Sequence, residues 1–163
     1  MTAATARAID LPDETATAAL ATELAACARQ GDVIGLSGPL GSGKTTFARY
    51  FIGARMGASP REKQEVPSPT FTLVETYQPE AGPAIWHFDL YRIETPEDAY
   101  ELGIEDAFAD GIALIEWPER LGGLMPCEHL QVALGAGKDD KARVATLSPS
   151  PSWADRVAGL KHG

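Results

Sequence analysis

The chain has 163 residues, of which 44% are hydrophobic, and it carries a formal net charge of −9. This length and composition suit one globular domain with a single core and exclude an intrinsically disordered chain. The acidic balance argues against a protein that grips DNA or RNA through its own surface, because phosphate contacts favour basic proteins. No apolar run approaches the roughly 20 residues of a membrane span, and the N-terminus has no apolar signal core. We therefore expect a cytoplasmic protein with no membrane role.

The first half of the chain predicts a helix, a strand, a second helix and a loop. Leucines and alanines recur at helical spacing over residues 12–29, and Val33–Ser37 reads as a short buried strand. Residues 46–56 predict an apolar-faced helix, and the polar, proline-containing residues 58–69 predict a loop.

The second half predicts mainly short strands. Strands over residues 71–77 and 84–91 are joined too closely for a helical crossover, so they form an antiparallel hairpin. The remaining predicted elements are short helices near 96–102 and 118–124, strands at 112–117, 128–134 and 143–147, and a terminal helix at 153–160. The prediction is a single domain over 1–163, with loose tails at about 1–10 and 150–163.

A phosphate-binding loop follows the first predicted strand. The segment Gly38-Pro39-Leu40-Gly41-Ser42-Gly43-Lys44-Thr45 matches the pattern G-x-x-x-x-G-K-[ST] at every fixed position. Such a loop directs backbone amides and a helix N-terminus at one point, where a polyphosphate binds. Lys44 is expected to reach the β- and γ-phosphates, and the Thr45 hydroxyl is expected to ligate Mg²⁺. A glycine-rich turn with a chance lysine is disfavoured by the flanking strand and helix.

Two strand-end acids are candidates to complete the site. Asp89 and Glu116 each end an apolar strand, where a phosphate-binding loop needs an acid for Mg²⁺ or for the attacking water. The spacing leaves open which acid has which role. Thr70, in the loop before the hairpin, is the candidate for a switch hydroxyl, with a proline-stiffened turn as the alternative.

The neighbours of these acids have two interpretations each. His87 alternates with Asp89 and so faces the same side of its strand, but an ordinary hydrogen-bonded strand histidine fits equally well. Trp117 either covers the nucleotide, contacts a partner or packs in the core.

Two motifs that the sequence lacks bear on which nucleotide is bound and which reaction is catalysed. The chain contains no asparagine and therefore no Asn-Lys-x-Asp guanine-reading motif, so ATP is the expected nucleotide. No arginine-rich lid typical of nucleotide kinases is visible, since Arg92 and Arg120 are isolated, and no internal arginine finger is evident.

Five segments together resemble one family. They are GPLGSGKTT (38–46), SPTFTL (68–73), HFDLYR (87–92), ELGIED (101–106) and IEWPE (115–119), in the order found in the TsaE (YjeE) family of bacterial P-loop ATPases. The phosphate-binding loop is shared with many families, whereas HFDLYR followed by IEWPE is specific to this one. The resemblance spans about residues 20–132.

The resemblance implies a fold, a ligand set and partners. The expected fold is an α/β P-loop NTPase with a mixed, mainly parallel sheet, an antiparallel hairpin after the loop helix, and flanking helices. The family acts with TsaD and TsaB proteins in threonylcarbamoyladenosine modification of tRNA, so tRNA would be reached only through the complex. Its members hydrolyse ATP weakly alone, and the cycle is thought to reset the complex.

The resemblance also assigns residues by motif. The implied catalytic residues are Glu116, Asp89 and Thr70, and the implied Mg²⁺ residues are Thr45, Asp89 and Glu116. The expected ATP-binding residues are Gly38, Leu40, Gly41, Ser42, Gly43, Lys44, Thr45, Thr46 and Trp117. The alternatives are a small-molecule or nucleotide kinase, and a non-catalytic ATP-sensing interaction module.

Overall fold

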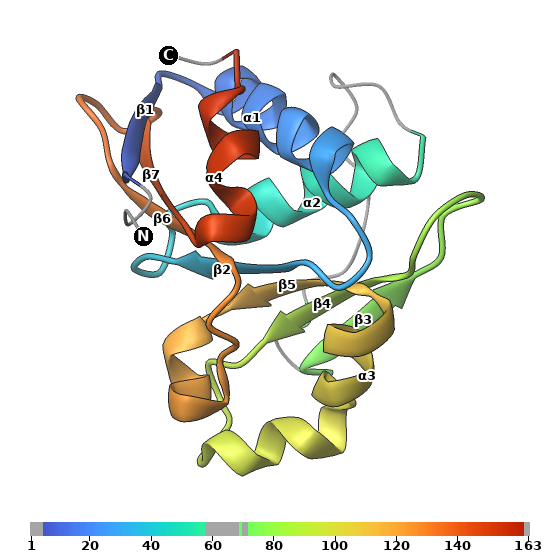
Figure 1. The fold of residues 1–163 in the computed structure, drawn as a ribbon. Helices are drawn as coiled ribbons and strands as arrows, with labels where there is room; N and C mark the ends of the chain where they lie inside the picture. The colour runs from blue at the N-terminus through green and yellow to red at the C-terminus, as the bar shows by residue number, and fades with distance from the viewer. Residues whose placement is uncertain (1–4, 58–68, 70–71, 162–163) are drawn as a thin grey trace.

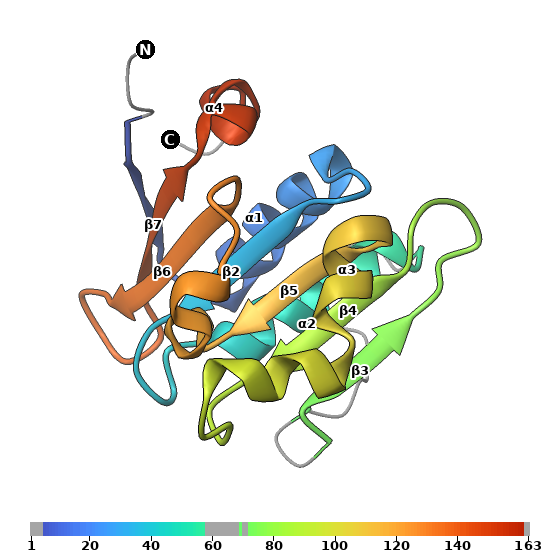
Figure 2. The ribbon, with the colours of Figure 1, turned by 60° about the horizontal axis from the view of Figure 1, so that its bottom comes forward.

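The computed structural model describes residues 5–57, 69 and 72–161, which form one sheet with helices on both faces (Figures 1 and 2). The elements in chain order are β1 (Arg7–Leu11), α1 (Glu14–Cys27), β2 (Val33–Ser37), α2 (Lys44–Arg55), β3 (Val74–Tyr77), β4 (Ile85–Asp89), η1 (Pro96–Leu102), α3 (Ile104–Asp110), β5 (Ile112–Glu116), η2 (Pro118–Leu124), β6 (Leu130–Ala136), β7 (Arg143–Pro149) and α4 (Pro151–Ala158). The η elements are 3₁₀ helices.

The sheet is parallel at its centre and antiparallel toward both edges. Its seven strands run in the order β1-β7-β6-β2-β5-β4-β3. Strand β2 pairs in parallel with β5 and β6, and β5 pairs in parallel with β4. The β3–β4, β6–β7 and β7–β1 pairs are antiparallel. The carboxyl ends of β2, β4 and β5 therefore meet at one edge of the sheet, where α/β proteins bind ligands.

Two apolar layers bury the sheet. Helices α1, α2 and α4 cover one face, around Leu20, Phe47, Phe51 and Trp153. The elements η1, α3 and η2 cover the other face, around Phe88 and residues of those three elements. Because both faces are covered, β2 is buried along nearly its whole length, which is why it reads as a continuous apolar run rather than an alternating one.

The fold class expected from the sequence is confirmed, including the hairpin of β3 and β4 after the loop helix. Most of strand β1 and all of helix α4 fall in the end segments, about 1–10 and 150–163, for which the sequence suggested loose tails. Thr70, the expected switch residue, lies outside the described residues. Within residues 5–57, 69 and 72–161, no helix has the length and apolar character needed to cross a membrane.

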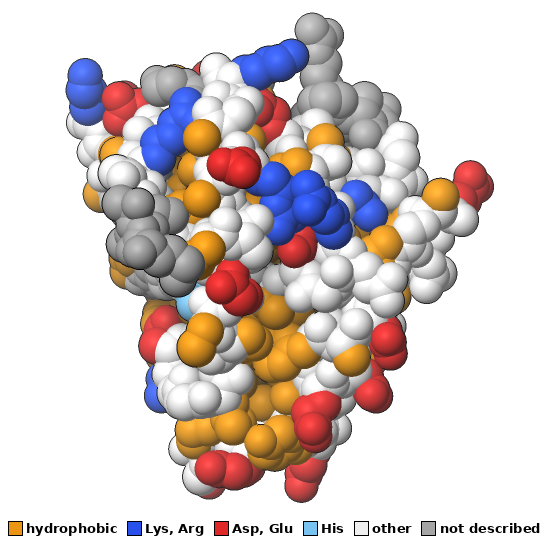
Figure 3. Space-filling model, viewed as in Figure 1, with side chains coloured by type: hydrophobic (Ala, Val, Ile, Leu, Met, Phe, Trp, Pro, Cys, Tyr) orange, Lys and Arg blue, Asp and Glu red, His pale blue; other side chains and the backbone are white. Residues whose placement is uncertain are grey.

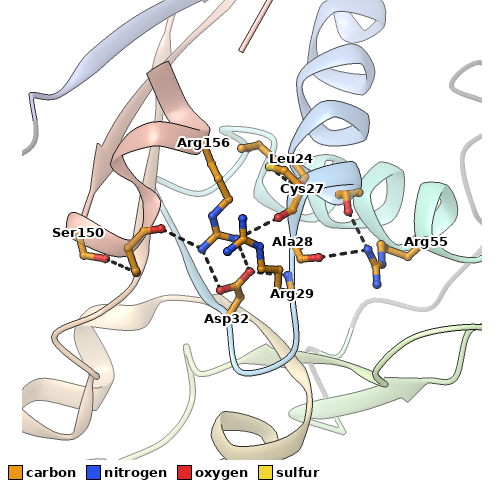
Figure 4. Close-up of polar contacts among 10 residues, drawn as sticks. Leu24, Cys27, Ala28, Arg29, Asp32, Arg55, Ser150 and Arg156 are labelled. Carbon is orange, nitrogen blue, oxygen red and sulfur yellow. Dashed lines mark hydrogen bonds and ion pairs between the residues drawn. The ribbon is translucent and has the colours of Figure 1, made fainter. Parts of the chain in front are cut away.

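Arginines join α4 and α2 to the end of α1 (Figure 4). Helix α1 has no basic residue in its last turn, so its terminal carbonyls need donors from elsewhere. Arg55 donates to the carbonyls of Ala25 and Ala28, and Arg156 donates to the carbonyl of Cys27. In Figure 3, blue basic side chains gather where the ends of these helices meet. Arg55 and Arg156 therefore stabilise the fold by satisfying the last carbonyls of α1.

Candidate nucleotide site

The loop between β2 and α2 depends on glycine at its first and last bends. Gly43 caps α2 in a left-handed conformation with φ 101°. Gly38 has φ 139°, and a Cβ there would collide with the Leu134 carbonyl and the Ser42 hydroxyl. Glycine is the residue that adopts such conformations without steric cost and lets other backbone come this close. The first amides of α2 are thereby turned toward the carboxyl edge of the sheet.

Lys44 lies at the centre of this loop. Its side chain is only 5% exposed, and its ammonium donates to the carbonyls of Gly38 (2.7 Å) and Pro39 (2.9 Å). The same ammonium lies 4.4 Å from the centre of the Trp117 ring, a cation–π contact. Burial lowers the pKa of Lys44 below its ordinary value, while the carboxylates of Glu116, Glu119 and Asp89 act in the opposite direction. A bound polyphosphate would add negative charge beside this cation.

Glu116, at the end of β5, is hydrogen-bonded to Thr45 and His87. The Thr45 hydroxyl donates to its Oε1 at 2.9 Å and approaches Oε2 at 3.2 Å. The Nε2 atom of His87 lies 2.7 Å from the same Oε2. His87 and Glu116 are 0% and 3% exposed. A buried carboxylate needs such partners, because an unpaired buried charge is very costly.

Asp89, at the end of β4, lies directly opposite Glu116 in the parallel pairing of β4 with β5. It is 7% exposed, and its Oδ1 accepts the backbone N–H of Tyr91 at 3.1 Å. The sheet thus brings the two predicted acids to one edge. There Glu116, rather than Asp89, is the acid that bonds the Thr45 hydroxyl.

A cavity of about 330 Å³ opens over these residues. It is lined by Leu40, Gly41, Gly43, Lys44, Thr45, Thr46, Asp89, Glu116, Trp117 and Arg143. Of the other predicted ATP-binding residues, Gly38 accepts the Lys44 hydrogen bond, and Ser42 lines a neighbouring hollow of about 100 Å³.

The donors in the cavity fit Mg²⁺ that arrives with phosphate. Carboxylate and hydroxyl oxygens are the ligands that Mg²⁺ prefers, and it commonly keeps substrate phosphates among its ligands. Thr45, Asp89 and Glu116 offer such oxygens. Across the part of the chain that the structure describes, no group of three or more His, Cys, Asp or Glu is arranged to hold a metal alone. A metal here would therefore need the nucleotide as a further ligand.

Arg143 is a cavity residue that sequence reasoning missed. It begins β7, and its Nη2 donates to the Gly41 carbonyl at 3.2 Å. Its Nη1 donates to the carbonyls of Asp140 and Ala142, each at 2.8 Å. No sequence pattern marks it, because the contact spans 102 residues and depends on where the β6–β7 hairpin packs.

Three exposed or half-buried side chains, Trp117, Tyr91 and Arg120, form a row of ring contacts that begins at Lys44. The rings of Trp117 and Tyr91 are 4.8 Å apart, and the Arg120 guanidinium lies 5.7 Å from the Tyr91 ring. Trp117 has a left-handed backbone with φ 61°, which is uncommon for a bulky residue and typical of functional sites. It therefore covers Lys44 at some conformational cost.

Comparisons with known proteins agree on one family. The model of the family described as "Threonylcarbamoyl adenosine biosynthesis protein TsaE" matches residues 11–144. A "tRNA threonylcarbamoyladenosine biosynthesis protein TsaE" from Rickettsia bellii is 39% identical over 131 residues, covering 80% of this chain and 88% of that protein. The protein of the same name from Bacillus subtilis is 36% identical over 134 residues, covering 82% and 78%. A crystal structure of Bacillus YdiB matches with a TM-score of 0.75 and 26% identity, over 97% of this chain and 95% of that one.

Proposed function

This chain belongs to the TsaE family, and on that premise we propose that it is an ATPase that serves threonylcarbamoyladenosine modification of tRNA. It binds ATP with Mg²⁺ in the cavity over Lys44 and hydrolyses it slowly when alone. TsaD-like and TsaB-like proteins accelerate that hydrolysis, and the ATP cycle resets their complex between turnovers. The chain itself transfers no threonylcarbamoyl group.

One observation carries the proposal: the loop cation, the loop hydroxyl and two strand-end acids line a single cavity. Lys44, Thr45, Asp89 and Glu116 come from three separate elements, and the sheet order brings them together. Phosphoryl transfer needs little covalent chemistry from the protein and depends on positioning and charge stabilisation. These four residues supply that combination.

Slow hydrolysis by the isolated chain has support in the contacts of Arg143. Three backbone carbonyls already accept hydrogen bonds from its guanidinium. An arginine committed in this way is a poor finger for the transition state, and a missing finger lowers the rate by about 10³–10⁵. A partner protein that supplies or frees such a group accounts for stimulation. The net charge of −9 supports an indirect path to tRNA.

The binding half of the proposal is tested with Lys44→Ala. Titration of a fluorescent ATP analogue with Mg²⁺ should show an affinity loss of about 10- to 100-fold, because hydrogen bonds to charged groups contribute about 1.5–3 kcal/mol. Lys161→Ala, which changes an exposed lysine far from the cavity, should bind as the wild type does. Equal affinity of Lys44→Ala and wild type would reject the site.

The functional half is tested by measuring phosphate release from the chain alone, with tRNA, with the TsaD-like and TsaB-like proteins, and with all of them. We expect stimulation by the proteins and repeated threonylcarbamoyl transfer to tRNA only when this chain and ATP are present. Label transferred from ATP to an added acceptor would indicate a kinase instead. Full function with bound but unhydrolysed ATP would indicate a sensing module. Stimulation by tRNA alone would indicate an RNA-dependent ATPase.

A further inference from the structure

His87 has an unusually simple hydrogen-bonding environment for a buried histidine. Strand β4 places it on the face covered by α2, two residues before Asp89, and none of its surface is exposed. Its Nε2 contacts the Glu116 carboxylate at 2.7 Å. Its Nδ1 is buried and has no hydrogen-bond partner among the described residues.

The direction of the contact follows from the tautomer of the ring. A carboxylate group without its own proton only accepts hydrogen bonds, so the tautomer of His87 that bonds it carries its proton on Nε2. Buried polar atoms normally have partners, and each exception needs an explanation. Among the described residues, the polar contact of the ring is therefore the one across to β5, where it reaches an acid of the cavity.

The other donor to Glu116 belongs to the nucleotide loop. The Thr45 hydroxyl lies within hydrogen-bond distance of both carboxylate oxygens of Glu116. Under the function proposed above, the Thr45 oxygen also binds the metal that accompanies ATP, so its contact with Glu116 has to readjust. The His87 ring, by contrast, is held on strand β4, and the proposed function gives it no role as a metal ligand.

We propose that His87 is a positioning residue for Glu116, which keeps that carboxylate aimed into the cavity when the Thr45 hydroxyl turns to the metal. The inference rests on the proposed ATPase function. Partners that orient metal-site or catalytic groups typically change affinity or activity by about 10- to 100-fold when they are removed. His87 is thus expected to affect turnover far more than ATP binding.

Three substitutions separate the hydrogen bond from the shape of the ring. In His87→Gln the amide nitrogen lies about where Nε2 was, so a donor still reaches Glu116. In His87→Asn the amide nitrogen stops near the former Nδ1, and His87→Leu has no donor at all. We expect partner-stimulated turnover to fall about 10- to 100-fold in the Asn and Leu variants and to stay within about 3-fold in the Gln variant.

The controls separate this inference from the proposed function. ATP–Mg²⁺ affinity should stay within about 3-fold in all three variants, and His129→Gln, at a histidine bonded to the Pro126 carbonyl, should match wild type in turnover. Equal turnover of the Gln and Leu variants, high or low, would overturn the positioning role. If the wild-type chain did not bind ATP–Mg²⁺ at all, the proposed function itself would be overturned.

A second measurement needs neither hydrolysis nor a folded Leu variant. The chain has three histidines, so long-range ¹H–¹⁵N spectra of the ligand-free protein resolve the His87 ring. We expect a ring protonated at Nε2 whose signals shift in Glu116→Gln and stay unchanged in Glu80→Gln, at an exposed turn acid. His87 signals that do not respond to Glu116→Gln would contradict the contact itself.

Discussion

At the two ends of strand β2, acids with little exposure are held by different kinds of donor. Just before the strand, Asp32 is bound by the guanidinium of Arg156 at 2.6 and 3.1 Å (Figure 4). That guanidinium also lies 3.6 Å from the centre of the Trp153 ring. Beyond the other end, Glu116 on the adjacent strand is bound by the Thr45 hydroxyl and the His87 ring. The first acid is thus paired with a permanent cation, and the second with two groups that donate without a fixed positive charge.

The difference separates a structural acid from a functional one. Arg156 neutralises Asp32 and bonds the end of α1, so that pair joins α4 to the fold and leaves no charge to act on a ligand. Glu116 accepts no hydrogen bond from a lysine or arginine among the described residues, since the nearby Lys44 donates to loop carbonyls instead. A site for a divalent cation needs carboxylates of the second kind.

The largest expected effect is at the nucleotide end. Glu116→Gln keeps the size of the side chain and removes its charge, so partner-stimulated ATP hydrolysis should fall about 10²- to 10⁴-fold, the range for loss of a positioned acid or base. ATP binding should be nearly unchanged. Asp32→Asn, the matched change at the other end, should leave the rate per folded molecule at the wild-type value. Steady-state phosphate release measures both, and similar rates for the two variants would erase the distinction between the ends.

The next effect is at the structural end and appears in stability. Arg156→Met leaves Asp32 as a mostly buried acid without its cation, so the free energy of unfolding should fall by about 3 kcal/mol. Adding Asp32→Leu removes the stranded charge and should restore part of the loss. Urea unfolding measures both variants. A loss below about 1 kcal/mol in Arg156→Met would show that this pair contributes no more than an exposed one.

The sequence predicted the parts of the site that lie close together in the chain. The loop from Gly38 to Thr45 is recognisable because its strand, turn and helix follow each other directly. Asp89 and Glu116 were predicted as strand-end acids, but their relation to Thr45 depends on β2, β4 and β5 lying side by side. A contact across 71 residues, such as that of Thr45 with Glu116, has no local signal.

Short elements whose partners lie far away in the sequence were harder to predict. Strand β1 has five residues near the N-terminus, and its partner β7 lies at the far end of the chain, so Ile9 looked like part of a tail. Arg143 lacked a signal for the same reason. The comparison between the ends of β2 could not be drawn from sequence either, because Arg156 reaches Asp32 over 124 residues.

The smallest effect concerns another acid near the nucleotide loop that is held by a neutral donor. The Tyr50 hydroxyl on α2 donates to Glu14 Oε2 at 2.6 Å, beside the hollow that Ser42 and Thr46 line. Burial and this hydrogen bond raise the pKa of Tyr50 to about 12. A pKa raised in the folded state contributes stability that is complete below the unfolded pKa near 10 and is lost as the pH rises through the folded value.

Tyr50→Phe should therefore lower the free energy of unfolding by about 1 kcal/mol near neutral pH, the contribution of one hydrogen bond, and the difference from wild type should shrink between about pH 10 and pH 12. Urea unfolding at several pH values measures it. Tyr100→Phe, at a tyrosine that is 46% exposed, should match the wild-type pH dependence. A Tyr50→Phe difference that persists undiminished at about pH 12 would mean that the donated proton is not what the hydroxyl contributes to stability. The contrast between acids held by a fixed cation and acids held by other donors would then be limited to Asp32 and Glu116.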